Sequence, residues 1–267
     1  SDLCQDQPDS VVEWMRVGRW TKTTDYGEGS AAQAGFPDMP KWFQDNLETS
    51  KDCRRYLNKR NLSDETIKYF RLGFSSSSKQ TLYQFLKEQN FEDKELLESN
   101  VVKLDKNNKI RDFFYNRLMF PITNEYGKIV GFGGRVLDNS NPKYINSPES
   151  DFFKKRNILY NLYNAKQTIR SKKNMLICEG YMDVISLYDK NIKTAVAPLG
   201  TSLTENHLIL SWKYVSKPTL MFDGDTSGLK ASFKSAVMSL PYLTPSKLLQ
   251  FIILPNEYDP DLSLIHI

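Results

Sequence analysis

The chain has 267 residues, enough for one large or two modest domains, and its 40% hydrophobic and 12% aromatic content is typical of a globular protein. No stretch approaches the roughly 18 apolar residues of a membrane-spanning helix, which argues against a membrane protein. The net charge of +4 is unevenly spread, because residues 103–173 carry 15 basic and 6 acidic side chains whereas residues 174–267 carry 7 and 9. A polyanion-binding surface beside a metal site fits this asymmetry, and so does a solvated surface of mixed charge.

The cysteines are few and scattered. Cys4, Cys53 and Cys178 form no CxxC pair, and only His207 and His266 could join them. This pattern argues against a zinc site and against a disulfide framework. We therefore expect a chain without zinc that works in a reducing cytoplasm.

The first third of the chain predicts a lead-in followed by helices. Residues 1–38 are rich in glycine and small residues and keep no period for long, so they are expected to lie outside the core. A helical pattern runs over residues 41–70, where Ser63 is a plausible N-cap, and shorter helices are expected at residues 81–90 and 93–99.

A β-hairpin is predicted next. Apolar residues alternate over 118–122, Asn124-Glu125-Tyr126-Gly127 forms a turn, and a second strand continues over 129–136. Glycines at positions 131, 133 and 134 leave bare backbone, which suits the close approach of another chain or a ligand.

From residue 174 onward, short apolar strands alternate with helices. The expected strands cover residues 175–178, 194–197, 219–222 and 248–254, and the expected helices cover residues 182–188, 205–212 and 226–240. Thr226 or Ser227 is the expected cap of the last helix. Strands that alternate with helices over short loops predict an α/β fold, with a parallel sheet and helices on both of its faces.

Acidic residues follow three of these strands. They are Glu179 and Asp183 after the first strand, Asp223 and Asp225 after the third, and Asp259 and Asp261 after the fourth. Because the carboxyl ends of parallel strands meet at one edge of a sheet, all six carboxylates are expected in one crevice. Any one of these motifs alone is explained as an ordinary turn, but three at strand ends of one sheet are harder to explain so.

Six like charges repel one another, so such a cluster is costly without cations. Carboxylate oxygens are hard ligands that suit Mg²⁺ or Mn²⁺, and two or more such ions are expected here. A pair of ions could activate a 3′ hydroxyl and steady the pyrophosphate leaving group of a nucleotide. Glu179, Asp223 and Asp225 are the predicted catalytic residues.

Several motifs are similar to those of one family. Glu179-Gly180-Tyr181-Met182-Asp183-Val184 resembles the glutamate motif of the Toprim domain in bacterial replicative (DnaG-type) DNA primases, and Phe222-Asp223-Gly224-Asp225 resembles its paired-aspartate motif. Residues 197–204 and 254–261 resemble further Toprim blocks, and residues 56–74, 116–122, 131–135 and 143–149 resemble the preceding part of the same RNA polymerase core. The resemblance covers roughly residues 40–262. One departure is Lys155-Arg156, where the family commonly has Lys-Gly.

The resemblance implies a Toprim-like parallel sheet flanked by helices, preceded by a mixed α+β basic subdomain. Its expected boundaries are residues 1–38 for the lead-in, 39–173 for the basic subdomain, 174–262 for a C-terminally truncated Toprim domain and 263–267 for a tail.

The resemblance also implies a function, namely the synthesis of short RNA primers on single-stranded DNA from ribonucleoside triphosphates, by metal-dependent nucleotidyl transfer during DNA replication. For the full-length protein it implies a replicative helicase and a single-strand-binding protein as partners. Contacts to nucleic acid or nucleotide are then expected from Arg117, Arg135, Lys143, Asn146 and Lys155. His207 is expected to be a surface or capping residue without a catalytic role.

Two alternatives stay open at this point. A Toprim-type metal-dependent nuclease would use the same acidic edge, and a non-catalytic nucleic-acid-binding module would use only the basic segment. The basic hairpin upstream favours a polymerase over a nuclease. A type IA topoisomerase needs a nucleophilic tyrosine in a separate large domain, and this chain has no room for one.

Overall fold

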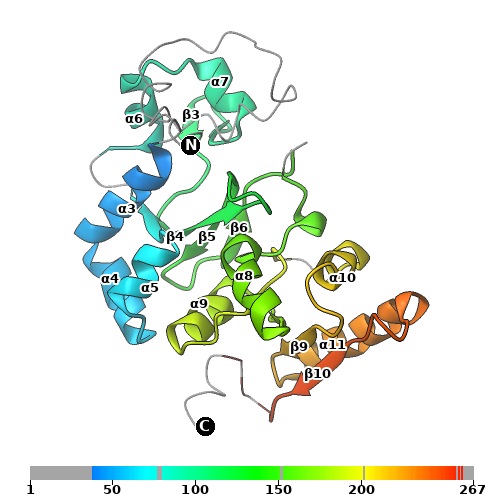
Figure 1. Cartoon of the computed structure of the whole chain (residues 1–267). Helices are drawn as coiled ribbons and strands as arrows, with labels where there is room; N and C mark the ends of the chain where they lie inside the picture. The colour runs from blue at the N-terminus through cyan, green and yellow to red at the C-terminus, as the bar shows by residue number, and fades with distance from the viewer. Residues whose placement is uncertain are drawn as a thin grey trace, which may run out of the picture.

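The computed structural model describes residues 38–76, 80–150, 153–200, 202–256, 258 and 260 (Figure 1). The expected lead-in, apart from Asp38, and the expected tail lie outside these residues. None of the helices in this part of the chain is both long enough and apolar enough to cross a membrane.

Three helices begin the described chain, namely α3 (Met39–Thr49), α4 (Lys51–Lys59) and α5 (Asp64–Tyr69). The Ser63 side chain accepts a hydrogen bond from the backbone N–H of Thr66, so its predicted role as an N-cap is confirmed. Two further short helices, α6 (Leu82–Glu88) and α7 (Asp93–Glu98), lie where they were predicted.

An antiparallel sheet follows, with the strand order β1-β4-β5-β6. Its strands are β1 (Gly73–Ser75), β4 (Arg117–Thr123), β5 (Ile129–Val136) and β6 (Tyr144–Asn146). The central pair β4–β5 is the predicted hairpin. A separate pair, β2 (Val102–Leu104) and β3 (Ile110–Asp112), lies beside α6 and α7.

The bare backbone of the hairpin is covered by the chain's own aromatic rings. A Cβ atom at Gly133 would lie 2.9 Å from the ring of Tyr181, and one at Gly134 would lie 2.7 Å from the ring of Phe114. The interpretation of these glycines as contact points for another chain or a ligand was wrong, because the space that a side chain would occupy is filled by internal packing.

The second half of the chain forms a four-stranded parallel sheet with the order β10-β9-β7-β8. The strands are β7 (Leu176–Ile177), β8 (Ala195–Val196), β9 (Thr219–Phe222) and β10 (Gln250–Ile253). The helices are α8 (Leu162–Lys172), α9 (Tyr181–Asp189), α10 (Glu205–Trp212) and α11 (Thr226–Ser239), and single 3₁₀ turns are η1 (Lys155–Asn157) and η2 (Leu240–Tyr242).

Successive residues of β9 point to opposite faces of this sheet. Met221 packs in a core with α9, whereas Leu220 and Phe222 pack in another core with α8, α10 and α11. Helices therefore cover both faces, and the predicted α/β architecture is confirmed. In Figure 1, α8 lies between the labelled strands of the antiparallel sheet (β4, β5 and β6) and those of the parallel sheet (β9 and β10).

One hydrophobic core joins the two sheets. It contains buried residues from Leu47 in α3 to Leu254 after β10. At its centre Phe120 of β4 stacks on Tyr181 of α9, with ring centroids 5.1 Å apart and planes 13° from parallel. The antiparallel sheet is thereby fixed against the carboxyl edge of the parallel sheet.

Candidate metal centre at the carboxyl edge of the parallel sheet

Glu179 and Asp223 follow two neighbouring parallel strands. Strands β7 and β9 are paired with Ile177 opposite Leu220, so both acids come at the same edge of the sheet. The Glu179 side chain is partly buried, and its Oε1 atom has neither solvent contact nor a hydrogen-bond partner. Burial raises the pKa of the Glu179 carboxyl, and the charges of Asp223 and Asp225 raise it further, while a backbone hydrogen bond from Asp223 opposes the rise.

Asp225 is the N-cap of α11. Its Oδ1 atom accepts a 2.8 Å hydrogen bond from the backbone N–H of Gly228, while the residue itself remains exposed. The predicted cap, Thr226 or Ser227, was therefore wrong by one or two residues. Gly228 is required at this entrance, because a Cβ atom there would lie 2.0 Å from the backbone oxygen of Asp223.

Asp183 lies in the first turn of α9. Its Oδ2 atom accepts a 2.9 Å hydrogen bond from the backbone N–H of Gly180. The pKa of the buried Cys178 thiol is raised well above its usual value by burial, and then by the charges of Asp183, Asp223 and Glu179. Because Gly180 directly follows Glu179, the hydrogen bond from Gly180 holds the Asp183 carboxylate near the end of β7.

Asp259 and Asp261 lie outside the described residues. Their neighbour Tyr258 accepts a 2.7 Å hydrogen bond at its backbone oxygen from the N–H of Gly224. The segment that follows β10 thus passes against the turn between Asp223 and Asp225.

The donor chemistry of this edge fits a hard divalent cation. It consists of carboxylate oxygens, one of them the buried and unpartnered Oε1 atom of Glu179, and their mutual repulsion is what a cation relieves. Within the described ranges, no group of three or more histidine, cysteine or acidic side chains is arranged to hold a metal ion. The geometry therefore supports Glu179 and Asp223 as the centre of a candidate site rather than a complete ligand set.

Arg117, the first residue of the hairpin strand β4, is buried and does not lie on the surface. The side chain is 8% exposed, and its guanidinium donates to the backbone oxygens of Gly134, Pro142 and Lys143 at 3.0–3.3 Å. These bonds hold the segment between β5 and β6 in place.

Arg135 is buried as well, with 7% of its surface exposed. Its Nε donates to the hydroxyl of Tyr144 at 3.0 Å, and its guanidinium lies 4.4 Å from the ring centre of Tyr56 in α4. The cation–π contact links the hairpin to α4, and the hydrogen bond links β5 to β6. Neither arginine projects freely toward solvent.

Lys143, Asn146 and Lys155 differ from one another. Lys143 is exposed and Lys155 is partly buried. Asn146 donates to the backbone oxygen of Leu199 at 3.0 Å and accepts a short hydrogen bond from the hydroxyl of Tyr181. Asn146 thus ties β6 to the loop after β8 and to the helix that begins beside Glu179.

Sequence reasoning missed how the basic turn η1 is held. His207 is fully buried, its Nδ1 accepts from the N–H of Thr204 at 3.2 Å, and its Nε2 lies 2.9 Å from the backbone oxygen of Lys155. The Thr204 hydroxyl donates to the backbone oxygen of Arg156 at 2.9 Å. His207 is therefore a capping residue and not a surface residue, and burial lowers the pKa of its imidazole. No local pattern could have revealed the contacts to Lys155 and Arg156, since these partners are 52 and 48 residues away in the sequence.

Comparisons with known proteins agree with this arrangement. A family model described as the N-terminal domain of the DNA primase catalytic core matches residues 42–166, and one described as a Toprim domain matches residues 173–246. The solved catalytic core of the Escherichia coli primase is 35% identical, with a TM-score of 0.80, and the match covers 89% of this chain and 75% of that one. This chain belongs to the DnaG-type DNA primase family. Catalysis by primases and Toprim domains generally depends on metal ions.

Other primases give the same result. A DnaG primase catalytic domain solved with single-stranded DNA is 36% identical, with a TM-score of 0.78, over 88% of this chain and 76% of that one. The DNA primase of Buchnera aphidicola subsp. Acyrthosiphon pisum is 39% identical over 221 residues, which are 83% of this chain and 38% of that protein. The chain thus spans about two fifths of the length of the curated primases that it matches.

Proposed function

We propose that this chain is a primase catalytic core that synthesises short RNA primers on single-stranded DNA by metal-dependent nucleotidyl transfer. It would act as a DNA-directed RNA polymerase in the cytoplasm. The observation that supports this proposal most directly is the buried, unpartnered Oε1 atom of Glu179 beside the charge of Asp223, at the edge of a Toprim sheet. Residues 39–173 and 174–262 would be its basic subdomain and Toprim domain.

Mg²⁺ or Mn²⁺ would be held by Glu179, Asp223 and Asp225, with Asp183, Asp259 and Asp261 as further ligands. When bound, two such ions would supply the positive charge that activates a 3′ hydroxyl and neutralises the pyrophosphate leaving group. Asp225 and Asp183 each use one carboxylate oxygen for a backbone hydrogen bond, which fixes the direction of the other oxygen.

We call the surface around Arg117, Arg135, Lys143, Asn146 and Lys155 the template track. Its exposed and its buried residues would have different roles. Lys143 and Lys155 would contact phosphates of the DNA or of the ribonucleoside triphosphate. Arg117 and Arg135 would shape the track from below, because their guanidinium groups already bind backbone carbonyls and aromatic groups. Asn146 would keep the track at a fixed distance from the carboxylates through Leu199 and Tyr181.

A replicative helicase and a single-strand-binding protein are the proposed partners of the longer protein. The DnaG domain solved with single-stranded DNA supports that template class, and the family match favours synthesis over the nuclease and the non-catalytic module.

Glu179→Gln tests the proposal, since it keeps the shape of the side chain and removes its charge. Loss of a metal-bridging carboxylate should cost on the order of 3 kcal/mol in the transition state, roughly a hundredfold in rate. The measurement is primer synthesis on a single-stranded template with labelled ribonucleotides and Mg²⁺ or Mn²⁺. Glu88→Gln on the exposed end of α6 is the matched control and should keep full activity.

The same reactions distinguish the alternatives. Metal-dependent cleavage of the template, abolished by Glu179→Gln, would establish a nuclease. DNA binding without synthesis or cleavage, unaffected by Glu179→Gln, would establish a binding module. Either result rejects the proposed function. Equal primer yields from Glu179→Gln and Glu88→Gln would reject the catalytic role of Glu179.

A further inference from the structure

Helix α11 packs against the parallel sheet mainly through small side chains, together with the partly buried Met238. Gly228, Ser235 and Ser239 are its buried residues. The hydroxyl groups of the two serines donate to the backbone oxygens of Ala231 and Ala236, at 2.8 and 2.7 Å, so they need no partner in the core. This is the reverse of the usual pattern, in which a surface helix buries its large apolar residues.

The other large apolar residues of the same helix face solvent. Leu229 is 43% exposed, Phe233 73%, Val237 51% and the adjoining Leu240 63%. Their spacing of four, four and three residues places them on one face, which we call the outer stripe. Neighbours at this spacing lie about 5–6 Å apart, so the outer stripe is a continuous apolar surface and not a set of isolated residues. Continuous exposed apolar surfaces of this kind mark interaction sites.

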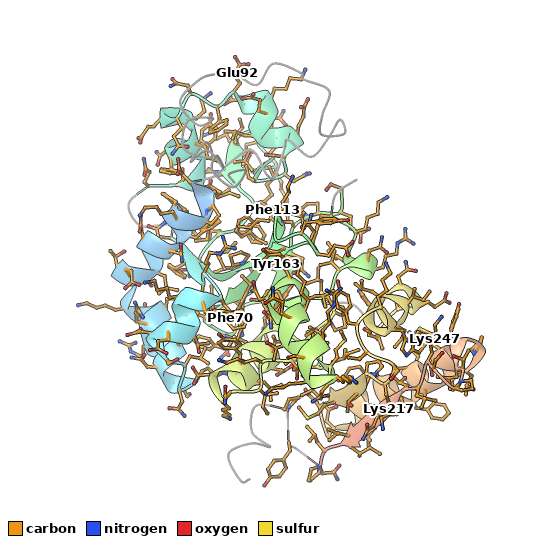
Figure 2. The ribbon with its side chains drawn as sticks, viewed as in Figure 1. Phe70, Glu92, Phe113, Tyr163, Lys217 and Lys247 are labelled. Atoms are coloured by element: carbon orange, nitrogen blue, oxygen red, sulfur yellow. The ribbon has the colours of Figure 1, made fainter. Side chains whose placement is uncertain are left out.

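Positive charge borders the outer stripe. Lys230 and Lys234 directly follow Leu229 and Phe233 and are exposed, and α11 contains no acidic residue. Two more exposed lysines, Lys217 and Lys247, are labelled in Figure 2. They lie at the end of the molecule opposite Glu92, which separates α6 from α7. A partner with acidic residues beside its apolar ones would complement both features.

We propose that the outer stripe docks an amphipathic helix of a partner protein, whose apolar face is bordered by glutamates or aspartates. A straight row of large side chains at helical spacing interdigitates with the same kind of row on a second helix. Lys230 and Lys234 pair with the acidic border and fix the orientation of the docked helix. This interaction is separate from nucleotidyl transfer, since the outer stripe contains none of the proposed metal ligands.

The probe is a fluorescein-labelled designed helix of about 20 residues, long enough to hold several helical turns. It carries leucines at helical spacing on one face and glutamates on both sides of that face. Fluorescence anisotropy measures its binding to the full chain, and binding should weaken as salt is raised. Phe233→Ser should lower the affinity at least tenfold, because a large aromatic side chain at the centre of an interface carries much of the binding energy.

Tyr126→Ser in the hairpin turn is the matched control, because Tyr126 is as exposed as Phe233, at 73%. It should leave the affinity unchanged. Lys230→Gln combined with Lys234→Gln should weaken binding several-fold and flatten its dependence on salt. A probe in which lysines replace the glutamates should not bind.

Several outcomes overturn the proposal. They are no binding of the acidic probe, equal binding of the acidic and basic probes, or equal effects of Phe233→Ser and Tyr126→Ser. A concentration-dependent dimer in analytical ultracentrifugation, abolished by Phe233→Ser, would assign the outer stripe to a second copy of this chain instead. Thermal melts of each variant check that the fold is retained, as expected for substitutions at exposed positions.

Discussion

Single residues at the carboxyl edge serve structure and the proposed chemistry at once. Asp225 caps α11 through Gly228 and contributes negative charge to the neighbourhood of Glu179. A cap needs only an oxygen acceptor, whereas a metal ligand needs the charge. The two roles can therefore be separated by choosing the replacement.

Asp225→Asn should leave stability within a few tenths of a kcal/mol, because asparagine caps helices about as well as aspartate. Asp225→Ala should lose about 0.5–2 kcal/mol of stability. Both variants should lose primer synthesis, because both lack the carboxylate. Urea unfolding and the primer assay measure the two effects separately.

Thr81→Ala is the control for capping alone, since Thr81 caps α6, far from the acidic edge. It should lose stability and keep activity. Full activity in Asp225→Asn would contradict the role of Asp225 as a ligand and leave it only a cap.

At the scale of elements, strong local patterns predicted the fold well. The apolar run over 219–222 and the alternation over 118–122 became β9 and β4, and α6, α7, α9 and α10 lie within a residue or two of their expected bounds. The three-residue strands β1, β2, β3 and β6 were not predicted, because three residues carry no usable period. Helix α8 was also missed, since only Leu162, Ala165 and Ile169 on it are buried.

The candidate site was less predictable than the fold. The acidic residues could be located because strand ends in a parallel sheet share an edge. The arginines could not be placed, because the carbonyls that bind Arg117 come from residues up to 26 positions away. Sequence alone gives charge, whereas burial of a charge depends on such distant partners.

The hairpin makes the role of its exposed lysine testable. The backbone of Lys143 is fixed, because its oxygen accepts hydrogen bonds from Arg117 and from the N–H of Val136, while its side chain is exposed. If Lys143 contacts a phosphate, Lys143→Ala should lower the slope of log affinity against log salt by about 0.7 for single-stranded DNA. Sequence preference should not change, because phosphate contacts carry no base information.

Salt titrations of wild type and Lys143→Ala on one labelled oligonucleotide measure this slope. Lys94→Ala on the exposed face of α7 is the control and should leave the slope unaltered. Identical slopes for wild type and Lys143→Ala would remove Lys143 from the track.

At the scale of the whole molecule, the family models divide the chain near residue 170, but the hydrophobic core does not. Phe120 of the antiparallel sheet contacts Tyr181 of the Toprim part. Asp189 in α9 accepts hydrogen bonds from Ser63, the N-cap of α5, and from Thr66 within α5. The proposed catalytic surface is formed where these two parts meet. Its geometry therefore depends on the shared core.

A shared core predicts that both parts unfold in one cooperative transition. Trp42 reports on α3 and Trp212 on α10, so variants that keep only Trp42 or only Trp212 of the four tryptophans follow each part separately. Their urea transitions should coincide, and Phe120→Ala should shift both midpoints downward together, since removing a buried phenylalanine costs about 3–5 kcal/mol. If that loss unfolds the chain, Phe120→Leu gives a smaller shift in the same direction. Two separate transitions, or a shift at Trp42 without one at Trp212, would show that the parts are independent and that the acidic edge can form without the hairpin.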